Sequence, residues 1–220
     1  DAERVKQCLE MATLAPTSSN MQLWECYHVT DEAVLKKLSR ACFNQLTARS
    51  ARQMVVFVTR QDRYHSHARA VIAFEEGNIQ RNSPADKQLK RTAKQHLYYD
   101  RVIPFLYSRC FGLAGLARKM LAQTIGLFRP IVHQVSESDM RVVVHKSCAL
   151  AVQTFMLAMS EAGYDTCPLS GCPTGWKLTW WLPAACAFPT AFGATVSVCL
   201  LKKPTTEWDN SRHRDCLGVQ

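Results

Sequence analysis

The stretch that decides the fold, residues 136–171, reads SESDMRVVVHKSCALAVQTFMLAMSEAGYDTCPLSG. Ser136 and Asp139 have the spacing of a helix capping box, and Gly163 suits the position that follows a helix end. Between these signals apolar side chains occupy nearly every face, which is typical of a helix buried at the centre of a domain. We therefore expect one long central helix, followed by a turn over residues 165–171.

Apolar runs elsewhere predict two strands that are covered on both faces, at residues 54–58 and 191–201. A shorter strand is expected from Trp24 through Val29. Helices are expected over residues 3–15, over 31–42 with an N-cap at Thr30, over 66–80, over most of 85–126 with breaks near Pro104 and at 112–115, and over 176–183. No internal repeat or linker separates these elements, so the sequence predicts a single α+β domain over residues 1–220.

The chain has 220 residues, a mass of 24.8 kDa, ten cysteines and a formal net charge of +9. Several cysteines lie within apolar patterns, where they act as small hydrophobic residues, and no signal peptide is recognisable at the start. Reduced thiols in a cytoplasmic protein are therefore expected. Proline and charged residues interrupt the apolar stretch 102–128, so we expect no membrane span there.

The positive charge indicates an anionic partner without identifying it. The basic segment 87–101 is interpreted as a solvated helix face, and nucleic-acid binding ranks last because no binding motif accompanies the charge. Cys167 and Cys172 lack a matching second pair of ligands, and His65 and His67 lie among charged residues on an expected solvated face. No metal site is predicted.

Two segments of the sequence are more informative about function than the overall composition. Residues 14–24 read LAPTSSNMQLW after an amphipathic helix, and residues 149–171 read ALAVQTFMLAMSEAGYDTCPLSG. In this order they resemble the nitroreductase family of FMN-dependent NAD(P)H oxidoreductases. The first is similar to the family's A-P-S-S-x-N-x-Q-P-W loop, with Leu23 in place of proline. The second is similar to the A-L-A-x-Q-x-x-x-L-A helix and the P-x-E-G turn, with Ser170 in place of glutamate, and the tail 211–214 resembles the closing K/R-x-R.

The resemblance implies FMN as the cofactor and NADPH or NADH as the electron donor. It assigns to FMN the residues Ser18, Ser19, Asn20, Gln22, Pro168, Leu169, Ser170, Gly171, Arg212 and Arg214. The two arginines suit a phosphate, and the amides of Asn20 and Gln22 suit the pyrimidine edge of the flavin. The backbone N–H groups of Ser170 and Gly171 suit flavin N5. No catalytic acid, base or metal is assigned, because the flavin carries the chemistry.

The resemblance also implies an α+β fold with a central, mostly antiparallel sheet flanked by helices, in an entwined homodimer with FMN at the subunit interface. The mechanism it implies is ping-pong: a nicotinamide delivers hydride to N5 and leaves, and an acceptor takes its place. The family normally carries an R-R-S-x-R flavin-anchoring segment before the first helix. This chain begins at Asp1 without one. We expect either that the sequence omits the segment or that FMN is held by fewer contacts.

The leading hypothesis is an FMN-dependent oxidoreductase that uses NAD(P)H to reduce small electron-poor acceptors such as nitroaromatics and quinones. It would act as a cytoplasmic homodimer without a nucleic-acid or membrane partner. One alternative is a divergent flavoenzyme, such as a dehalogenase or an enone reductase. Another is a dimer of the same fold that binds flavin or another anionic ligand without turnover, an interpretation that rests on Ser170 and the missing N-terminal segment.

Overall fold

The computed structural model describes residues 1–169 and the backbone of residues 196–202. The chain forms two compact units. The first comprises residues 1–16, residues 24–59 and the described residues after 147, and the second comprises residues 17–23 and 60–147. The longest helix, α8 (Glu137–Glu161), begins in the second unit and ends in the first.

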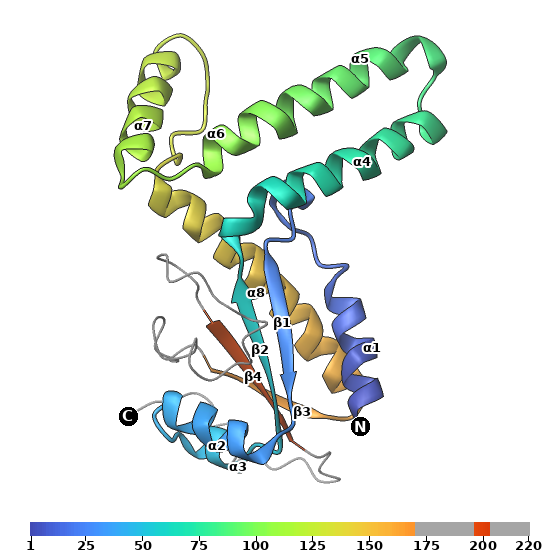
Figure 1. Cartoon of the computed structure of the whole chain (residues 1–220), viewed down its shortest axis with the longest axis vertical. Coiled ribbons are helices and arrows are strands. Elements are labelled where there is room, and N and C mark those ends of the chain that lie inside the picture. Colours follow the sequence, from blue (N-terminus) through green and yellow to red (C-terminus); the bar gives the residue numbers. More distant parts are fainter. Residues whose placement is uncertain (170–195, 203–220) are drawn as a thin grey trace. The chain divides into compact units, whose positions relative to one another are not determined.

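The first unit is built on an antiparallel sheet whose described strands lie in the order β1-β2-β4-β3 (Figure 1). These strands are β1 Trp24–Val29, β2 Gln53–Thr59, β3 Asp165–Leu169 and β4 Val196–Lys202. β2 pairs with β1 on one side and with β4 on the other. Residues 54–58 are fully buried within β2, as their continuous apolar run predicted.

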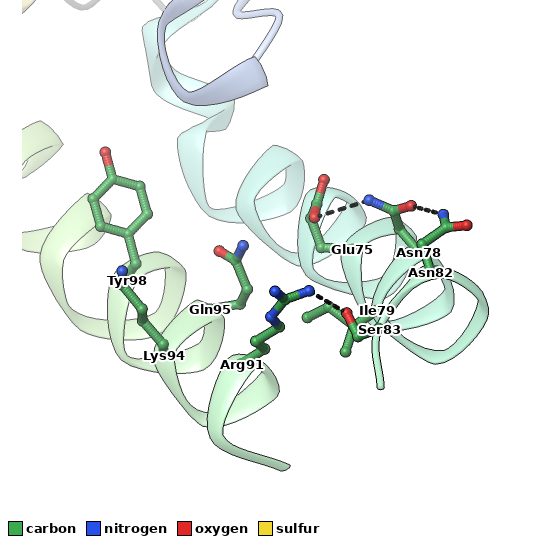
Figure 2. Close-up of a pocket in the computed structure, with 9 residues that line it drawn as sticks. All are labelled: Glu75, Asn78, Ile79, Asn82, Ser83, Arg91, Lys94, Gln95 and Tyr98. Carbon is green, nitrogen blue, oxygen red and sulfur yellow. Dashed lines mark hydrogen bonds between the residues drawn. The ribbon is translucent and has the colours of Figure 1, made fainter. Parts of the chain in front are cut away.

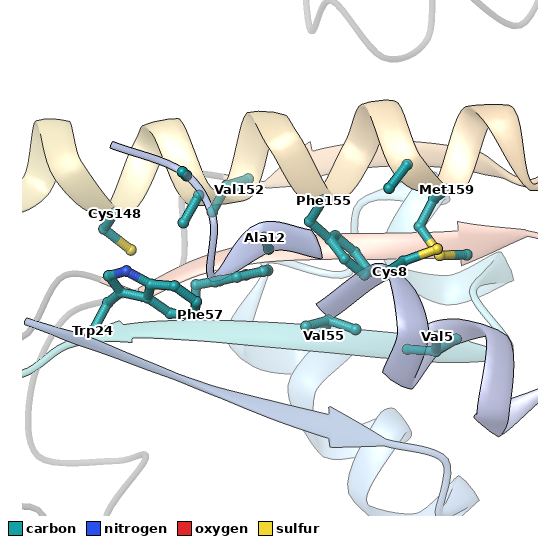
Figure 3. Close-up of a cluster of buried hydrophobic side chains, with 13 residues drawn as sticks. Val5, Cys8, Ala12, Trp24, Val55, Phe57, Cys148, Val152, Phe155 and Met159 are labelled. Carbon is teal, nitrogen blue, oxygen red and sulfur yellow. The ribbon is translucent and has the colours of Figure 1, made fainter. Parts of the chain in front are cut away.

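Side chains alternate across β2, so its two faces pack against different helices. The helices of this unit that precede α8 are α1 Ala2–Ala12, α2 Glu32–Ala41 and α3 Leu46–Ser50. Val55 and Phe57 pack with α1 and with the C-terminal half of α8 (Figure 3). Met54, Val56 and Val58 form a second cluster with α2 and the residues around α3. The predicted α+β fold, an antiparallel sheet flanked by helices, is confirmed.

The start and end of α8 are those predicted from the sequence. The Asp139 N–H donates to Ser136 Oγ at 3.1 Å, and the Ser136 N–H donates to Asp139 Oδ2 at 2.9 Å. Gly163, at a φ of +81°, follows the helix end. By length and composition alone α8 could cross a membrane. Its burial against the sheet of the first unit accounts for the same apolar composition.

Within the described residues, the second unit is helical. Besides η1 Ser18–Asn20 and the first part of α8, its elements are η2 Gln61–Arg63, α4 Tyr64–Asn82, α5 Ala85–His96, the π-helical turn η3 Leu97–Val102, α6 Ile103–Tyr107 and α7 Leu113–Gly126. Apolar side chains of α4, η3, α6 and α8 form its core together with Met21 and Leu23, which precede β1. No residue of α5 is buried, which confirms the predicted solvated face of the basic segment.

Two predicted details in the first unit are wrong. The N-cap of α2 is Asp31 rather than Thr30, because the Asp31 carboxylate accepts the N–H of Val34 at 2.9 Å. Residues 165–169 form a strand rather than a turn, because their backbone pairs with β4. Local turn-forming residues do not reveal such a distant partner. The expected helix at 176–183 and the first residues of the expected strand 191–201 lie outside the described residues.

The expected helix break near Pro104 is also wrong. The helical backbone continues from α5 through η3 into α6 and ends at Tyr107. Ahead of the proline the chain adopts a wider π-type turn, in which the Ile103 N–H donates to the carbonyl oxygen of Tyr98. The wider turn accommodates a residue that has no N–H of its own, so the helix passes through the proline without ending.

Candidate functional site

The loop Thr17–Leu23, which carries four of the predicted site residues, belongs wholly to the second unit. Its centre is the 3-10 turn η1 (Ser18–Asn20). Ser19, Asn20 and Gln22 have φ angles of +53°, +51° and +43°. Such left-handed backbone costs a non-glycine residue of the order of 1–3 kcal/mol and persists only where its surroundings hold it. The contacts around this loop therefore decide its shape.

Hydrogen bonds within the loop close it into a compact turn. The Asn20 N–H donates to the Thr17 carbonyl oxygen at 3.0 Å, and the Met21 N–H donates to that of Ser18 at 3.1 Å. The Thr17 hydroxyl oxygen accepts the N–H of Gln22 at 3.1 Å. Thr17 thus holds two of the backbone N–H groups that follow it.

Helices of the second unit hold the same loop from outside. The phenol of Tyr99, on η3, donates to the Ser19 carbonyl oxygen at 2.9 Å. The hydroxyl oxygen of Ser147, on α8, accepts the Ser18 N–H at 3.2 Å. These anchors lie 80 and 129 residues away in the sequence, so the loop takes its shape from the assembled helical layer.

His67, on α4, supplies a third anchor. Its Nδ1 lies 2.8 Å from the carbonyl oxygen of Met21. Because a carbonyl oxygen only accepts, Nδ1 carries a proton and donates it. The expectation that the H-x-H pair lies on a solvated face is therefore wrong for His67, which is half-buried and positions the loop.

Two tyrosines contact the serine hydroxyls of the loop. The oxygen of the Tyr98 phenol lies 2.7 Å from Ser19 Oγ. The Tyr107 phenol is hydrogen-bonded to the Ser18 side chain. Burial raises the pKa of Tyr107 above its usual value, against a smaller lowering effect of Ser18, so the phenol is neutral at physiological pH.

The loop is apolar on one side and polar on the other. Met21 and Leu23 are 2% and 3% exposed and belong to the core of the unit. Asn20 is exposed, and its side-chain amide forms no hydrogen bond with the part of the chain that the structure describes. An amide offers both donors and acceptors. The loop therefore presents this group to solvent on a backbone that its neighbours hold in place.

The other predicted site residues fall elsewhere. Pro168 and Leu169 lie on β3 in the first unit, opposite Cys199 and Val198 of β4. Pro168 is exposed, whereas Leu169 is buried. Thus the structure brings together Ser18, Ser19, Asn20 and Gln22 in one unit, and Pro168 and Leu169 in the other. Ser170, Gly171, Arg212 and Arg214 lie outside the described residues.

A groove of about 520 Å³ lies between α4 and α5, and sequence reasoning did not find it (Figure 2). Its lining includes Glu75 and Asn78 from α4, and Arg91 and Lys94 from α5. Tyr98 also lines it while contacting the hydroxyl of the loop residue Ser19. The signal in the sequence is the tyrosine pair at positions 98 and 99, which lies within the basic segment 87–101.

A sequence model of the nitroreductase family matches residues 1–175, a span that includes both the anchored loop and β3. The chain belongs to the nitroreductase family. No curated protein sequence matches it.

Solved structures agree with the family. A Staphylococcus epidermidis protein assigned as an NAD(P)H:FMN oxidoreductase has a TM-score of 0.62 and 17% identity, over 96% of this chain and 80% of that one. A nitroreductase family protein from Streptococcus pneumoniae has a TM-score of 0.59 and 16% identity, over 95% and 83%. The NADPH:FMN oxidoreductase of Vibrio harveyi, complexed with NAD+, has a TM-score of 0.50 and 13% identity, over 93% and 60%.

At these identities the structural likeness shows the fold. The family membership rests on the sequence model, and these neighbours share its fold.

Proposed function

We propose that this nitroreductase family member binds FMN and uses NADPH or NADH to reduce small electron-poor acceptors, such as nitroaromatics and quinones, with donor and acceptor binding in turn. The observation that carries the proposal is the loop Thr17–Leu23, whose sequence resembles the family's flavin-binding loop. Its backbone is anchored by Tyr99, Ser147 and His67. A site on an anchored loop binds without the entropic cost of ordering it.

The groups on this loop fit the polar edge of a flavin ring. That edge presents both hydrogen-bond donors and acceptors, and the exposed Asn20 amide matches either kind. The exposed Ser18 offers a hydroxyl beside it. When bound, FMN supplies hydride transfer at N5, and the protein supplies binding and orientation.

The remaining assignments complete the proposed site. Pro168 and Leu169 lead from β3 toward residues 170 and 171, whose backbone N–H groups would face N5. Arg212 and Arg214 would bind the phosphate, because planar guanidinium groups match phosphate oxygens in bidentate fashion. The chain's role in this scheme is to hold the ring, orient it and bind the phosphate.

The first test is the absorbance spectrum of the purified protein. A flavin band near ~450 nm is expected, either as purified or after addition of FMN, because the cofactor carries the chemistry. Asn20→Ala should weaken FMN binding about 3–10-fold, the effect of one neutral hydrogen bond. Gln7→Ala, an exposed amide on α1, serves as the control and should leave FMN affinity unchanged. A protein that stays colourless in excess FMN would refute the proposal.

A second test separates turnover from binding. Anaerobic NADPH or NADH should bleach the flavin band, and nitrofurazone or a quinone should restore it. A band that stays oxidised would indicate a flavin-binding protein without reductase activity. Bleaching without turnover of either acceptor would indicate a divergent flavoenzyme, such as a dehalogenase or an enone reductase.

We further propose that the protein is a cytoplasmic homodimer. Within the first unit, α8 exposes the apolar side chains of Leu150 and Leu157, which are 48% and 62% accessible. A second copy covering this face would remove that apolar area from water. Light scattering coupled to size-exclusion chromatography should give a dimer, and Leu157→Glu should shift it toward monomer.

A further inference from the structure

Apart from the groove between α4 and α5, the structure has a pocket of about 630 Å³ in the first unit. It shares no residue with the proposed flavin site. One wall is a single face of α2, made by positions 32, 35, 36, 39 and 40, which recur at helical spacing. The opposite wall is formed by Ala48 of α3 and the residues that follow it as far as Arg52. A volume of this size matches pockets that bind small molecules.

The lining of this pocket is strongly basic. It carries Lys36, Arg40, Arg49 and Arg52 against one carboxylate, Glu32. Glu32 is already paired with Lys36 at 2.7 Å. The three guanidinium groups form no ion pair with any carboxylate among the described residues. Among the described residues, the pocket therefore carries excess positive charge that no carboxylate neutralises.

Ser39 also lines the pocket and is short of a hydrogen-bond partner. The residue is 6% exposed, and its Oγ is buried without any partner among the described residues. A buried serine hydroxyl on a helix ordinarily bonds to a backbone carbonyl of the preceding turn. Ser39 is one of the residues that line the pocket. A ligand oxygen there would supply the missing partner.

We propose that this pocket binds the phosphate group of a small anionic ligand through Arg40, Arg49 and Arg52, with Ser39 as an additional donor. Planar guanidinium groups match phosphate oxygens in bidentate geometry, and several of them can share one phosphate. The volume of about 630 Å³ suits a small molecule, and Leu35 and Ala48 add apolar side chains to the lining for an uncharged part of it.

The test is calorimetric titration of the purified protein, with whatever flavin it retains, using inorganic pyrophosphate at fixed ionic strength. Saturable binding is expected. Arg40→Gln and Arg49→Gln should each weaken it about tenfold, because each removes a charge-assisted contact. Arg4→Gln is the matched control. Arg4 is exposed on α1 in the same unit and lies outside the pocket, so the affinity should not change.

Ser39→Ala supplies a readout that general electrostatics would not give. It leaves the charge unchanged but should weaken pyrophosphate binding about 3–10-fold. The melting temperature of the free variant should equal or exceed that of the wild type, because the substitution removes a buried hydroxyl without a partner. Lack of saturable binding would overturn the proposal, as would equal losses in Arg4→Gln and Arg49→Gln, or unchanged affinity in Ser39→Ala. Titrating the same variants with FMN reports separately on the proposed flavin site.

Discussion

The phenol of Tyr99 donates a 2.9 Å hydrogen bond to the carbonyl oxygen of Ser19, a residue whose φ angle is +53°. Tyr99 is only 7% exposed and belongs to the core of the second unit. A residue with left-handed backbone in the candidate loop is thus held by a side chain that is buried in the core of the unit. Loss of this bond should therefore affect the core and the loop together.

Tyr99→Phe tests this relationship. It removes the donor and leaves the ring, so the unfolding free energy should fall by about 1 kcal/mol, the net worth of one hydrogen bond. The FMN dissociation constant should rise several-fold, because the loop is less well held. Urea unfolding and flavin titration measure the two effects. Tyr98→Phe is the control: its bond to Ser19 Oγ is exposed, so its loss should destabilise the protein less.

His96 makes the stability of the α4–α5 hairpin depend on pH. Its Nδ1 lies 2.8 Å from Asp100 Oδ2, and its Nε2 lies 2.8 Å from Glu76 Oε1. The hydrogen bond to Asp100, followed by that to Glu76, raises the pKa of His96 above its usual value. The folded protein therefore holds the proton more tightly than the unfolded chain. The stabilisation that protonated His96 gives the folded protein is therefore complete below pH ~6.5. It is lost as the pH rises through the raised pKa of His96 in the folded protein.

His96→Gln should therefore lower the melting temperature more at pH 6 than at pH 9. Thermal unfolding across this range measures the difference, and Glu76→Gln should show a smaller pH dependence of the same sign. His65→Gln is the control, because His65 is exposed on α4 and lies outside this cluster. If His96→Gln lowered the melting temperature equally at every pH, protonation of His96 would not be the source of the pH dependence.

The sequence predicted those features that depend on neighbouring residues. The capping box at Ser136 and Asp139 and the buried run 54–58 are local patterns, and both are confirmed. Features that depend on distant partners were missed. Residues 165–169 become a strand only because β4 pairs with them, and His67 becomes an anchor only because it lies against Met21.

The same limit applies to the candidate site. The motif identified the loop and its polar residues, because their types and order are written in the chain. Its anchors Tyr99 and Ser147 are 80 and 129 residues from their partners, and no spacing rule connects positions so far apart. The sequence also did not reveal that the helix continues through Pro104. That continuation depends on the π-type turn ahead of the proline, and composition does not encode this backbone geometry.

Arg118, 2% exposed on α7, joins three segments of the second unit. Its Nε donates to the Val135 carbonyl oxygen at 2.8 Å, and its Nη1 donates to the carbonyl oxygens of Phe105 and Ser108 at 2.8 and 3.0 Å. Arg118→Met keeps much of the volume but leaves these carbonyls unpaired, so we expect a loss of about 3 kcal/mol or more. Chemical denaturation measures it. The exposed neighbour Lys119→Met should change stability by less than about 0.5 kcal/mol.

Two helical glycines should respond to alanine in opposite directions. A Cβ at Gly77 on α4 would meet the flexible end of Arg81 at 3.3 Å, so Gly77→Ala should stabilise the protein by roughly 0.5–1 kcal/mol through helix propensity. A Cβ at Gly115 on α7 would lie 2.8 Å from the backbone nitrogen of Glu137, closer than real contacts allow.

Displacement of Glu137 has a further cost. Its carboxylate accepts the N–H groups of Cys110 and Gly112 at 3.0 and 3.1 Å, which secures the turn before α7, and the hydrogen bond to Cys110 is the main reason that its pKa is lowered. Gly115→Ala should therefore destabilise the protein by about 2 kcal/mol, despite the same propensity gain. Denaturation curves of Gly77→Ala and Gly115→Ala, compared with the wild type, measure the two changes in unfolding free energy. If both variants gain stability, the close approach of α7 to the start of α8 is not a constraint on the folded chain.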